Sequence, residues 1–394
     1  MSRTLGTVVR GIRTPIVKEG DDVVQIVFDS LKEALESENI TLRDKDVIGI
    51  TESLIARAQG NYCTTKDIAE DVNSKFKGRI GVVFPILSRN RFSIILKGII
   101  ESGKKVTLLL SYPSDEVGNH LMDLDDLDNL KINPHDRVLT EKEYRDLFGE
   151  KVYHEFTRID YVKLYKDIGK DNIEIIFAND PRVILNYTDE VLVSDIHSRF
   201  RTKRLIEEAG GKNVLTLDDI MNKPINDSGY NPEYGILGSN LASDSELKLF
   251  PRDGQKYVDA IQEKFLQEYG KKIEVLIYGD GAFKDPVGKI WELADPCVSP
   301  AFTEGLKGIP NEIKIKYIAD NELENVYGEE AVNIIKQKIY AKEQDLLGRA
   351  ESLGTTPRQI TDLIGSLCDL TSGSGDKGTP VVFIQGYFDN FASE

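Results

Sequence analysis

Two aspartates stand in turns where a divalent cation could find oxygen ligands. Asp280 lies just beyond the largely apolar run 273–278 and is flanked by two glycines, which let the backbone approach a ligand closely. Asp244 ends the turn-like stretch 238–244, just before a second apolar segment. Magnesium in proteins commonly takes one or two carboxylates, with phosphates and waters completing its shell. Taken alone, either aspartate is explained more simply as a turn residue that bonds its own backbone.

Several other site chemistries are excluded by the residues they need. The chain has four histidines, which are His120, His135, His154 and His197. No two of them are four residues apart and none lies near a cysteine pair, so neither a zinc site nor an H-E-x-x-H hydrolase is expected. No G-x-S-x-G elbow occurs. The glycine-rich stretch 373–379 fails as a P-loop because Lys377 is out of place.

Charge and cysteine usage indicate the kind of partner and compartment. Fifty Lys and Arg stand against 66 Asp and Glu, and this net charge of −16 argues against a nucleic-acid partner, which needs clustered cations. A small anionic ligand is still compatible, because a few cations in one pocket reverse the local potential. The three cysteines are far apart, the start of the chain lacks a signal-peptide segment, and no apolar run approaches the ~18 residues of a membrane span. We therefore expect a cytoplasmic protein without a membrane partner.

The elements that would position these residues alternate between strand and helix patterns. Short apolar runs predict buried strands, and helical apolar spacing between them predicts helices. The predicted strands include residues 46–51, 80–85, 106–111 and 273–278, and the predicted helices include 23–35, 91–101 and 257–269. This alternation indicates an α/β fold. A length of 394 residues suits two domains, or one domain with a large insertion.

Three separated segments resemble the γ-glutamyl ligases of coenzyme F420, the family that adds glutamate to F420-0 using GTP. The first segment runs from Val9 to Asp22 and continues through residues 44–60, which are similar to the family's D-G-D-I-L-V-V-T-x-K-I-V-S-K-A-E-G. There Arg57 occupies the position of a nucleotide-contacting lysine. Together with the second segment, the resemblance implies nucleotide contacts at Arg13, Thr14, Pro15, Ile16, Glu52, Ser53, Arg57 and Asn240.

The second and third segments lie in the later part of the chain. Asn240 and Asp244 keep the family's N-x-x-x-D spacing, and Asp280 matches its second metal aspartate. The resemblance therefore implies Asp244 and Asp280 as ligands of Mg²⁺ or Mn²⁺. Residues 355–386 are similar to the family's closing helix, glycine turn and P-V-V strand. Two departures are Gly281, in place of a hydroxyl residue that helps hold a second metal, and Leu247, in place of an asparagine.

The middle of the chain has no clear counterpart in the short ligases of this family. We therefore expect an α/β fold of mixed sheets in which residues 1–61 and 234–394 form a γ-glutamyl-ligase-like core. Residues 62–233 are expected to form an inserted region or second domain. The resemblance also implies assembly as a homodimer.

The activity that the resemblance implies is nucleotide- and metal-dependent amide formation. GTP, or ATP, would phosphorylate a carboxylate acceptor, and the amine of an amino acid such as L-glutamate would attack the acyl phosphate. The partners are then small molecules: a nucleotide, an amino acid and an acceptor. The acceptor is open between the deazaflavin coenzyme, a folate and another carboxylate. Two other interpretations are a different nucleotide-dependent transferase and a non-catalytic nucleotide-binding or assembly protein, which Gly281 and Leu247 favour.

Overall fold

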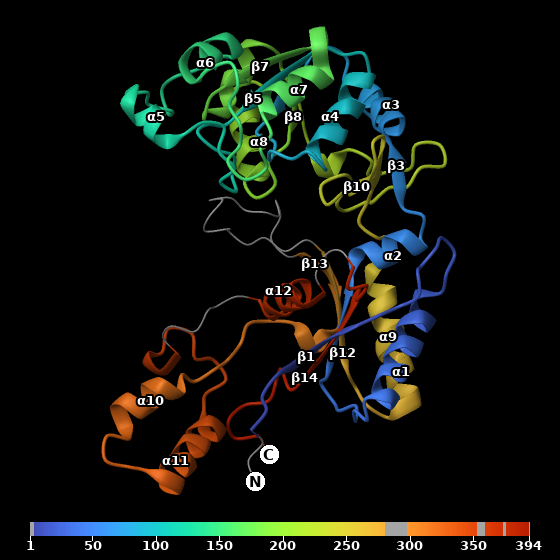
Figure 1. Ribbon diagram of the computed structural model, residues 1–394, viewed down its shortest axis with the longest axis vertical. Helices are drawn as coiled ribbons and strands as arrows, with labels where there is room; N and C mark the ends of the chain where they lie inside the picture. The colour runs from blue at the N-terminus through green and yellow to red at the C-terminus, as the bar shows by residue number, and fades with distance from the viewer. Residues whose placement is uncertain (1–3, 280–297, 353–358, 373–375, 394) are drawn as a thin grey trace.

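The two ends of the chain build one mixed sheet. The computed structural model describes residues 4–279, 298–352, 359–372 and 376–393. Its five-stranded sheet has the order β1-β14-β2-β12-β13 (Figure 1). These strands are β1 (Val8–Ile12), β2 (Val47–Thr51), β12 (Glu274–Gly279), β13 (Val298–Phe302) and β14 (Val381–Gln385). Only β2 and β12 are parallel neighbours, so the sheet is mixed.

Helices cover both faces of this sheet, which explains its continuous apolar strands. Alternate strand residues, such as Ile48 and Val275, pack on one face with α1 (Val23–Ser37) and α9 (Gly254–Tyr269). The residues between them, such as Val47 and Leu276, pack on the other face with α12 (Ile360–Ser372). Asp22 caps α1, because its carboxylate accepts a hydrogen bond from the backbone N–H of Gln25.

A six-stranded sheet is made entirely of residues between 80 and 216. Its order is β6-β7-β5-β4-β8-β9, and every neighbouring pair is parallel except β6 with β7. The strands are β4 (Ile80–Val83), β5 (Val106–Leu110), β6 (Leu139–Thr140), β7 (Ile173–Phe177), β8 (Glu190–Val193) and β9 (Asn213–Thr216). Because the chain goes outward from β4 to one side and later returns to the other, the sheet is doubly wound, with its switch point between β4 and β8.

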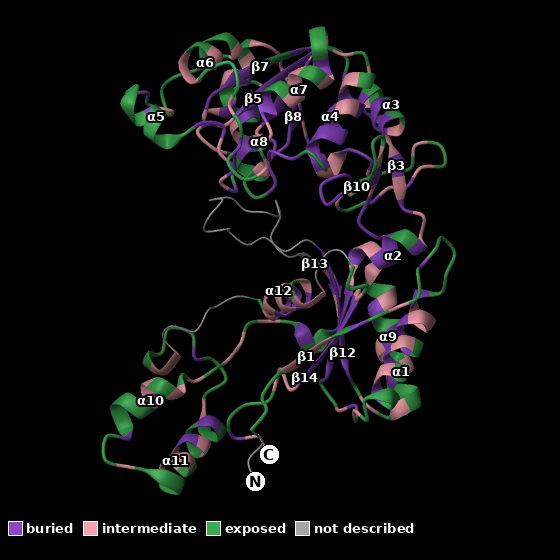
Figure 2. Ribbon diagram, viewed as in Figure 1, coloured by how far each residue is buried: buried purple, intermediate pink, exposed green. Residues whose placement is uncertain are grey.

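Helices also lie on both faces of the six-stranded sheet. The parts of the molecule built on the five- and six-stranded sheets are called the two lobes, and in both of them the buried residues are concentrated on the strands (Figure 2). They are α3 (Thr65–Lys75), α4 (Phe92–Glu101), α5 (Leu124–Asn129), α6 (Glu141–Phe148), α7 (Tyr161–Gly169) and α8 (Arg199–Glu208). Two further helices, α10 (Ile315–Glu322) and α11 (Gly328–Ala341), have a small apolar core of their own and lie apart from both large sheets in Figure 1. The predicted α/β class with mixed sheets is confirmed.

A three-stranded antiparallel sheet lies where the chain passes between the two lobes. It contains β3 (Tyr62–Thr64), β10 (Asn240–Ser243) and β11 (Glu246–Lys248), in the order β10-β11-β3. It therefore joins strands from both sides of the expected boundary between residues 233 and 234. Asn61 is fully buried at this crossing, and its carbonyl accepts a hydrogen bond from the backbone N–H of Leu249 at 2.9 Å.

Candidate functional site

A cleft of about 490 Å³ opens where the parallel strands β2 and β12 end. Thr51 and Tyr278 are paired in the register of these strands, so the carboxyl ends of both strands meet at one edge of the sheet. The loop after β1, the start of α2 (Glu52–Ala58) and the segment before β14 complete the walls. Six of the eight predicted nucleotide contacts line this cleft, namely Thr14, Pro15, Ile16, Glu52, Ser53 and Arg57. Two segments that are separated in the sequence are thus brought together by the sheet.

The start of α2 fits closely against the end of β12. Glu52 is the first residue of α2 and is only 3% exposed. A Cβ at Gly279 would stand 2.6 Å from the Glu52 Cγ, so only glycine permits this approach. Two carboxylates, Glu52 and Asp369, line the cleft, whereas Arg57 is exposed at its rim.

The three-stranded sheet adds a cation to the same place. The Lys248 ammonium donates a hydrogen bond to the Ser53 hydroxyl. Lys248 is paired with Asn240 on one side and with Tyr62 on the other, so the three side chains share one face of the sheet. Burial raises the pKa of Tyr62, and the charges of Arg57 and Glu52 both act on its hydroxyl, in opposite directions. This face therefore fronts the helix that carries the predicted contacts.

Lys248 could not be predicted as a site residue from the sequence, and the reason is physical. It lies in a three-residue strand, and neither its spacing nor a motif distinguishes it from other surface lysines. Its place beside Ser53 follows from antiparallel pairing between segments almost two hundred residues apart. Only the observation that it faces Asn240 across a tight hairpin could have drawn attention to it.

Asn240, the seventh predicted contact, is held by a residue of the six-stranded lobe. Arg91 precedes α4, is 8% exposed, and donates from Nε to the Ser239 carbonyl at 2.6 Å and from Nη2 to the Asn240 Oδ1 at 3.2 Å. A guanidinium carries only donors, so the carbonyl end of the Asn240 amide must face Arg91 and its N–H₂ end must face elsewhere. The six-stranded lobe thus fixes the orientation of a predicted site residue.

The two predicted metal ligands are not seen together. Asp244 is exposed in the turn between β10 and β11, where its backbone carbonyl accepts a hydrogen bond from Lys97 Nζ at 3.0 Å. Asp280 lies outside the described residues. Leu247, which stands where the family has an asparagine, is fully buried in the apolar core, so it contributes nothing to the cleft. Within the described ranges, no group of three or more His, Cys, Asp and Glu side chains is arranged to hold a metal.

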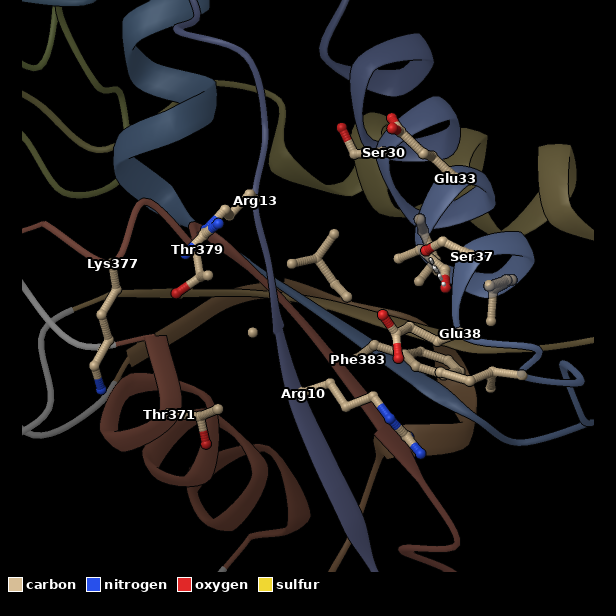
Figure 3. Close-up of a pocket in the computed structure, with 16 residues that line it drawn as sticks. Arg10, Arg13, Ser30, Glu33, Ser37, Glu38, Thr371, Lys377, Thr379 and Phe383 are labelled. Carbon is tan, nitrogen blue, oxygen red and sulfur yellow. Dashed lines mark hydrogen bonds between the residues drawn. The ribbon is translucent and has the colours of Figure 1, made fainter.

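Arg13, the remaining predicted contact, lines a neighbouring pocket of about 840 Å³ (Figure 3). This pocket follows the outer edge of β1 and is bounded by α1 and by Thr371, Lys377 and Thr379. Thr379 lines both the pocket and the cleft, so the two spaces are adjacent. Gly11 allows this closeness, because a Cβ there would stand 2.9 Å from the Thr379 side chain.

The arrangement is that of an α/β protein with a ligand cleft at the carboxyl ends of parallel strands, the usual position of binding sites in such folds. Residues 11–386 match the family model described as F420-0:gamma-glutamyl ligase. This range spans nearly the whole chain, and the chain therefore belongs to that family, which confirms the resemblance. No curated protein matches it. Family membership supports a γ-glutamyl ligase, and hence an enzyme that acts on small molecules.

No helix within the described part of the chain is long and apolar enough to cross a membrane.

Proposed function

We propose that this chain is a nucleotide- and metal-dependent ligase that joins the amine of L-glutamate to a carboxylate acceptor. The observation that carries the proposal is the gathering of six predicted nucleotide contacts around one cleft at the carboxyl ends of β2 and β12. GTP is the proposed nucleotide and ATP the alternative. The deazaflavin coenzyme is the first acceptor to test, followed by a folate.

Two cations stand at the cleft, together with the carboxylates of Glu52 and Asp369. Arg57 is at its rim, and Lys248 reaches it through Ser53. The two positive charges balance these two carboxylates, so a bound metal ion would add the positive charge that a polyphosphate requires. We propose that Lys248 and Arg57 neutralise the nucleotide phosphates, while the loop of Thr14 to Ile16 holds the nucleoside end.

The proposed reaction has two steps. In the first, an acceptor carboxylate oxygen bonds to the terminal phosphorus, the bond from that phosphorus to the bridging oxygen breaks, and the nucleoside diphosphate leaves. In the second, the glutamate nitrogen bonds to the acyl carbon, the carbon–oxygen bond breaks, inorganic phosphate leaves, and the nitrogen loses a proton. The protein's part is to position the reactants and to neutralise the moving charge.

We propose that Asp244 and Asp280 hold Mg²⁺ or Mn²⁺. Carboxylate oxygens suit these hard cations, and no described residue donates a hydrogen bond to the Asp244 carboxylate, which leaves its oxygens accessible. Glu52 and Asp369 add carboxylates at the cleft itself. When bound, the cation would supply charge neutralisation as the phosphoryl group moves.

Thermal unfolding with GTP, ATP or GDP, each with and without Mg²⁺ or Mn²⁺, tests the site. A ligand that binds only the folded state stabilises it by about 2.7 kcal/mol at one hundred times its Kd. We expect a metal-dependent rise in the melting temperature with GTP, and a smaller rise in Lys248→Met. Lys256→Met removes an exposed lysine of α9 and should behave like the wild type. A shift of equal size in both variants would remove Lys248 from the phosphate site.

Amino-acid-dependent nucleotide turnover separates the ligase from the non-catalytic alternative. If no GDP is released with any acceptor in the presence of L-glutamate, the chain only binds nucleotide. GDP release that requires an acceptor and rises with L-glutamate supports the ligase. We also propose that the chain assembles as the homodimer that the resemblance implies, and sedimentation velocity tests this assembly.

A further inference from the structure

The hairpin of β10 and β11 carries two residues of the proposed site, Asn240 at its start and Asp244 in its turn. Residues of the six-stranded lobe contact both positions. Arg91, which directly precedes α4, donates hydrogen bonds at the start of the hairpin, one of them to the Asn240 side chain. Lys97, within α4, donates from Nζ to the Asp244 carbonyl at 3.0 Å. The hairpin is therefore held from one helix at its start and at its turn.

The turn of the hairpin is also bonded to the start of α3. The Ser245 carbonyl accepts a hydrogen bond from the backbone N–H of Thr65 at 2.9 Å. The helices α3 and α4 pack closely, since a Cβ at Gly98 would stand 2.7 Å from the Ile68 side chain. Only glycine permits this approach. The two helices therefore support the hairpin as one packed unit.

Arg91 is itself fixed to the core of the six-stranded lobe. Its backbone N–H donates to the Ser88 hydroxyl at 2.9 Å, and the Ser88 backbone N–H donates to the Tyr165 hydroxyl at 2.9 Å. Tyr165 is fully buried, and the ring of Phe92, the residue after Arg91, packs edge-on against it. A guanidinium presents its donors in a rigid planar fork, so an Arg91 that is held in place also fixes its acceptors.

We propose that Arg91 and Lys97 are positioning residues of the ligase site, which hold the hairpin so that Asn240 and Asp244 face the nucleotide and its metal ion. The inference rests on the proposed ligase function. On its other side, the hairpin reaches the nucleotide cleft through the hydrogen bond from Lys248 to Ser53. The six-stranded lobe, which the short ligases lack, thus sets the geometry of the site without touching the substrates.

Calorimetric titration of the full chain with GDP, with and without Mg²⁺, tests this role, because it measures the affinity of the folded molecules. Arg91→Lys keeps the positive charge but loses the planar fork, and we expect it to raise the Kd for GDP with Mg²⁺ roughly tenfold. Lys97→Met removes the contact with Asp244. We expect it to raise the Kd roughly fivefold with Mg²⁺ and to leave the Kd without Mg²⁺ unchanged.

Two controls remove the same kinds of contact elsewhere in the six-stranded lobe. Arg145→Lys disrupts two hydrogen bonds from a guanidinium to Asp160, and Lys105→Met removes a hydrogen bond of 2.8 Å from an ammonium to the Asp171 carbonyl. Both controls should keep the wild-type Kd, whatever they do to the free energy of unfolding. Hydrogen exchange of peptides covering residues 239–248 should be faster in the two hairpin variants and unchanged in the controls.

The outcomes separate this inference from the ligase proposal. If the wild type binds GDP with Mg²⁺ and both hairpin variants bind it with the same Kd, the positioning role is overturned and the ligase proposal stands. A loss of affinity without faster exchange in the hairpin, or an equal loss in the controls, also overturns that role. A loss in Lys97→Met that is equal without Mg²⁺ would show that Lys97 does not act through Asp244. A wild type that binds no nucleotide contradicts the ligase proposal, and the positioning role falls with it.

Discussion

Asp195 is a carboxyl group that the fold buries without satisfying both of its oxygens. It follows β8 at the switch point of the six-stranded sheet and is 1% exposed. The hydroxyls of Ser198 and Thr202 donate to its Oδ2 at 2.7 and 2.8 Å, whereas Oδ1 has no hydrogen-bond partner among the described residues. Burial, assisted by the nearby charge of Glu116, raises the pKa of Asp195 to about 6.

This pKa makes the stability of the protein depend on pH in a stated direction. Because the native state holds the Asp195 proton more tightly than the unfolded chain, whose pKa is near 3.8, the stabilising contribution is lost as pH rises from about 4 to 6. A difference of this size corresponds to roughly 3 kcal/mol. Asp195→Asn keeps an oxygen acceptor and cannot ionise. We expect the free energy of unfolding of Asp195→Asn, measured in urea, to rise relative to that of the wild type as the pH increases from about 4 to 6.

The control for Asp195 is Asp189→Asn, which changes an exposed carboxylate whose pKa is lowered by Lys212. It should show no such gain. A difference between Asp195→Asn and the wild type that stays constant from pH 4 to 8 would contradict the assignment.

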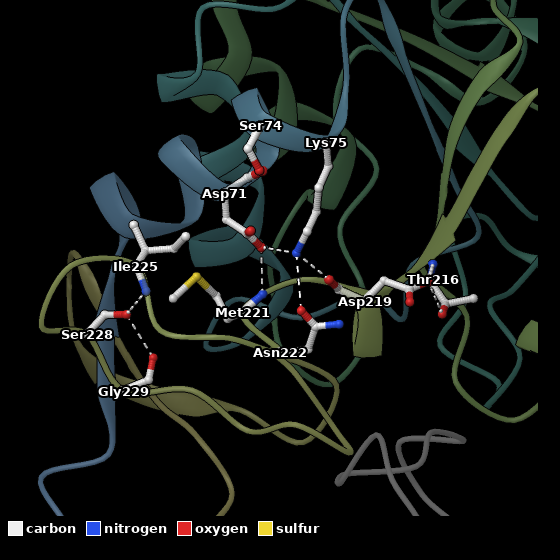
Figure 4. A network of polar contacts seen from close by, with 10 residues as sticks. All are labelled: Asp71, Ser74, Lys75, Thr216, Asp219, Met221, Asn222, Ile225, Ser228 and Gly229. Carbon is white, nitrogen blue, oxygen red and sulfur yellow. Dashed lines mark hydrogen bonds and ion pairs between the residues drawn. The ribbon is translucent and has the colours of Figure 1, made fainter.

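At the scale of elements, α3 is fastened to a loop that the chain reaches much later. The Asp71 carboxylate accepts hydrogen bonds from Lys75 Nζ and from the backbone N–H of Met221, both at 2.7 Å, and Lys75 also donates to the Asp219 carbonyl at 2.6 Å (Figure 4). Asp71 is 3% exposed, so its charge depends on these partners. Both members of this α3 ion pair thus hydrogen-bond to the backbone of the segment that follows β9.

Lys75→Met should destabilise the protein by about 3 kcal/mol, because it leaves the buried charge of Asp71 without its cation. Urea unfolding measures this loss. Lys163→Met removes an exposed pair with Asp167 at the same helical spacing and should cost less than about 1 kcal/mol. Equal losses in the two variants would mean that burial of Asp71 adds nothing to the pair. Adding Asp71→Asn to Lys75→Met should recover part of the loss.

The elements that sequence predicted well are those with long apolar patterns. The predicted strands at 46–51, 80–85, 106–111 and 273–278 correspond to β2, β4, β5 and β12, with ends that agree within two residues. The hairpin of β10 and β11 was missed, because its strands are short and most of β10 is exposed. The residues of the candidate site differ in the same way in how far the sequence predicts them. Contacts near the strand ends were predicted, whereas Lys248 and Arg91 depend on pairing and packing between distant segments.

At the scale of the whole molecule, the apolar cores separate by chain region. One core contains buried residues only between 63 and 249, whereas the cores on the two faces of the five-stranded sheet draw on residues before 59 and after 257. We propose that these are two folding units, with the expected core of 1–61 and 234–394 as one and the expected insertion of 62–233 as the basis of the other. The hairpin of β10 and β11 packs with the second unit.

Native-state hydrogen exchange in increasing urea tests the two units. Peptides covering β4, β5 and β7 should lose protection together, and those covering β2, β12 and β14 should lose it together at a different urea concentration. GDP with Mg²⁺ should raise the second concentration more than the first, because most of the proposed nucleotide contacts lie in that unit. A single common transition for all these peptides would show that the two sheets unfold as one.

The pairing of Tyr62 with Lys248 has a consequence for how such a chain could arise. Opposite residues of an antiparallel pair are about 5 Å apart, so the long stretch between them leaves the five-stranded lobe and re-enters it at nearly one point. A gene could therefore gain or lose the whole stretch in a single event without altering any pairing of the five-stranded sheet. The surrounding lobe would keep its order of strands, whereas the proposed contacts Asn240 and Asp244 would leave with the stretch, because both lie between Tyr62 and Lys248.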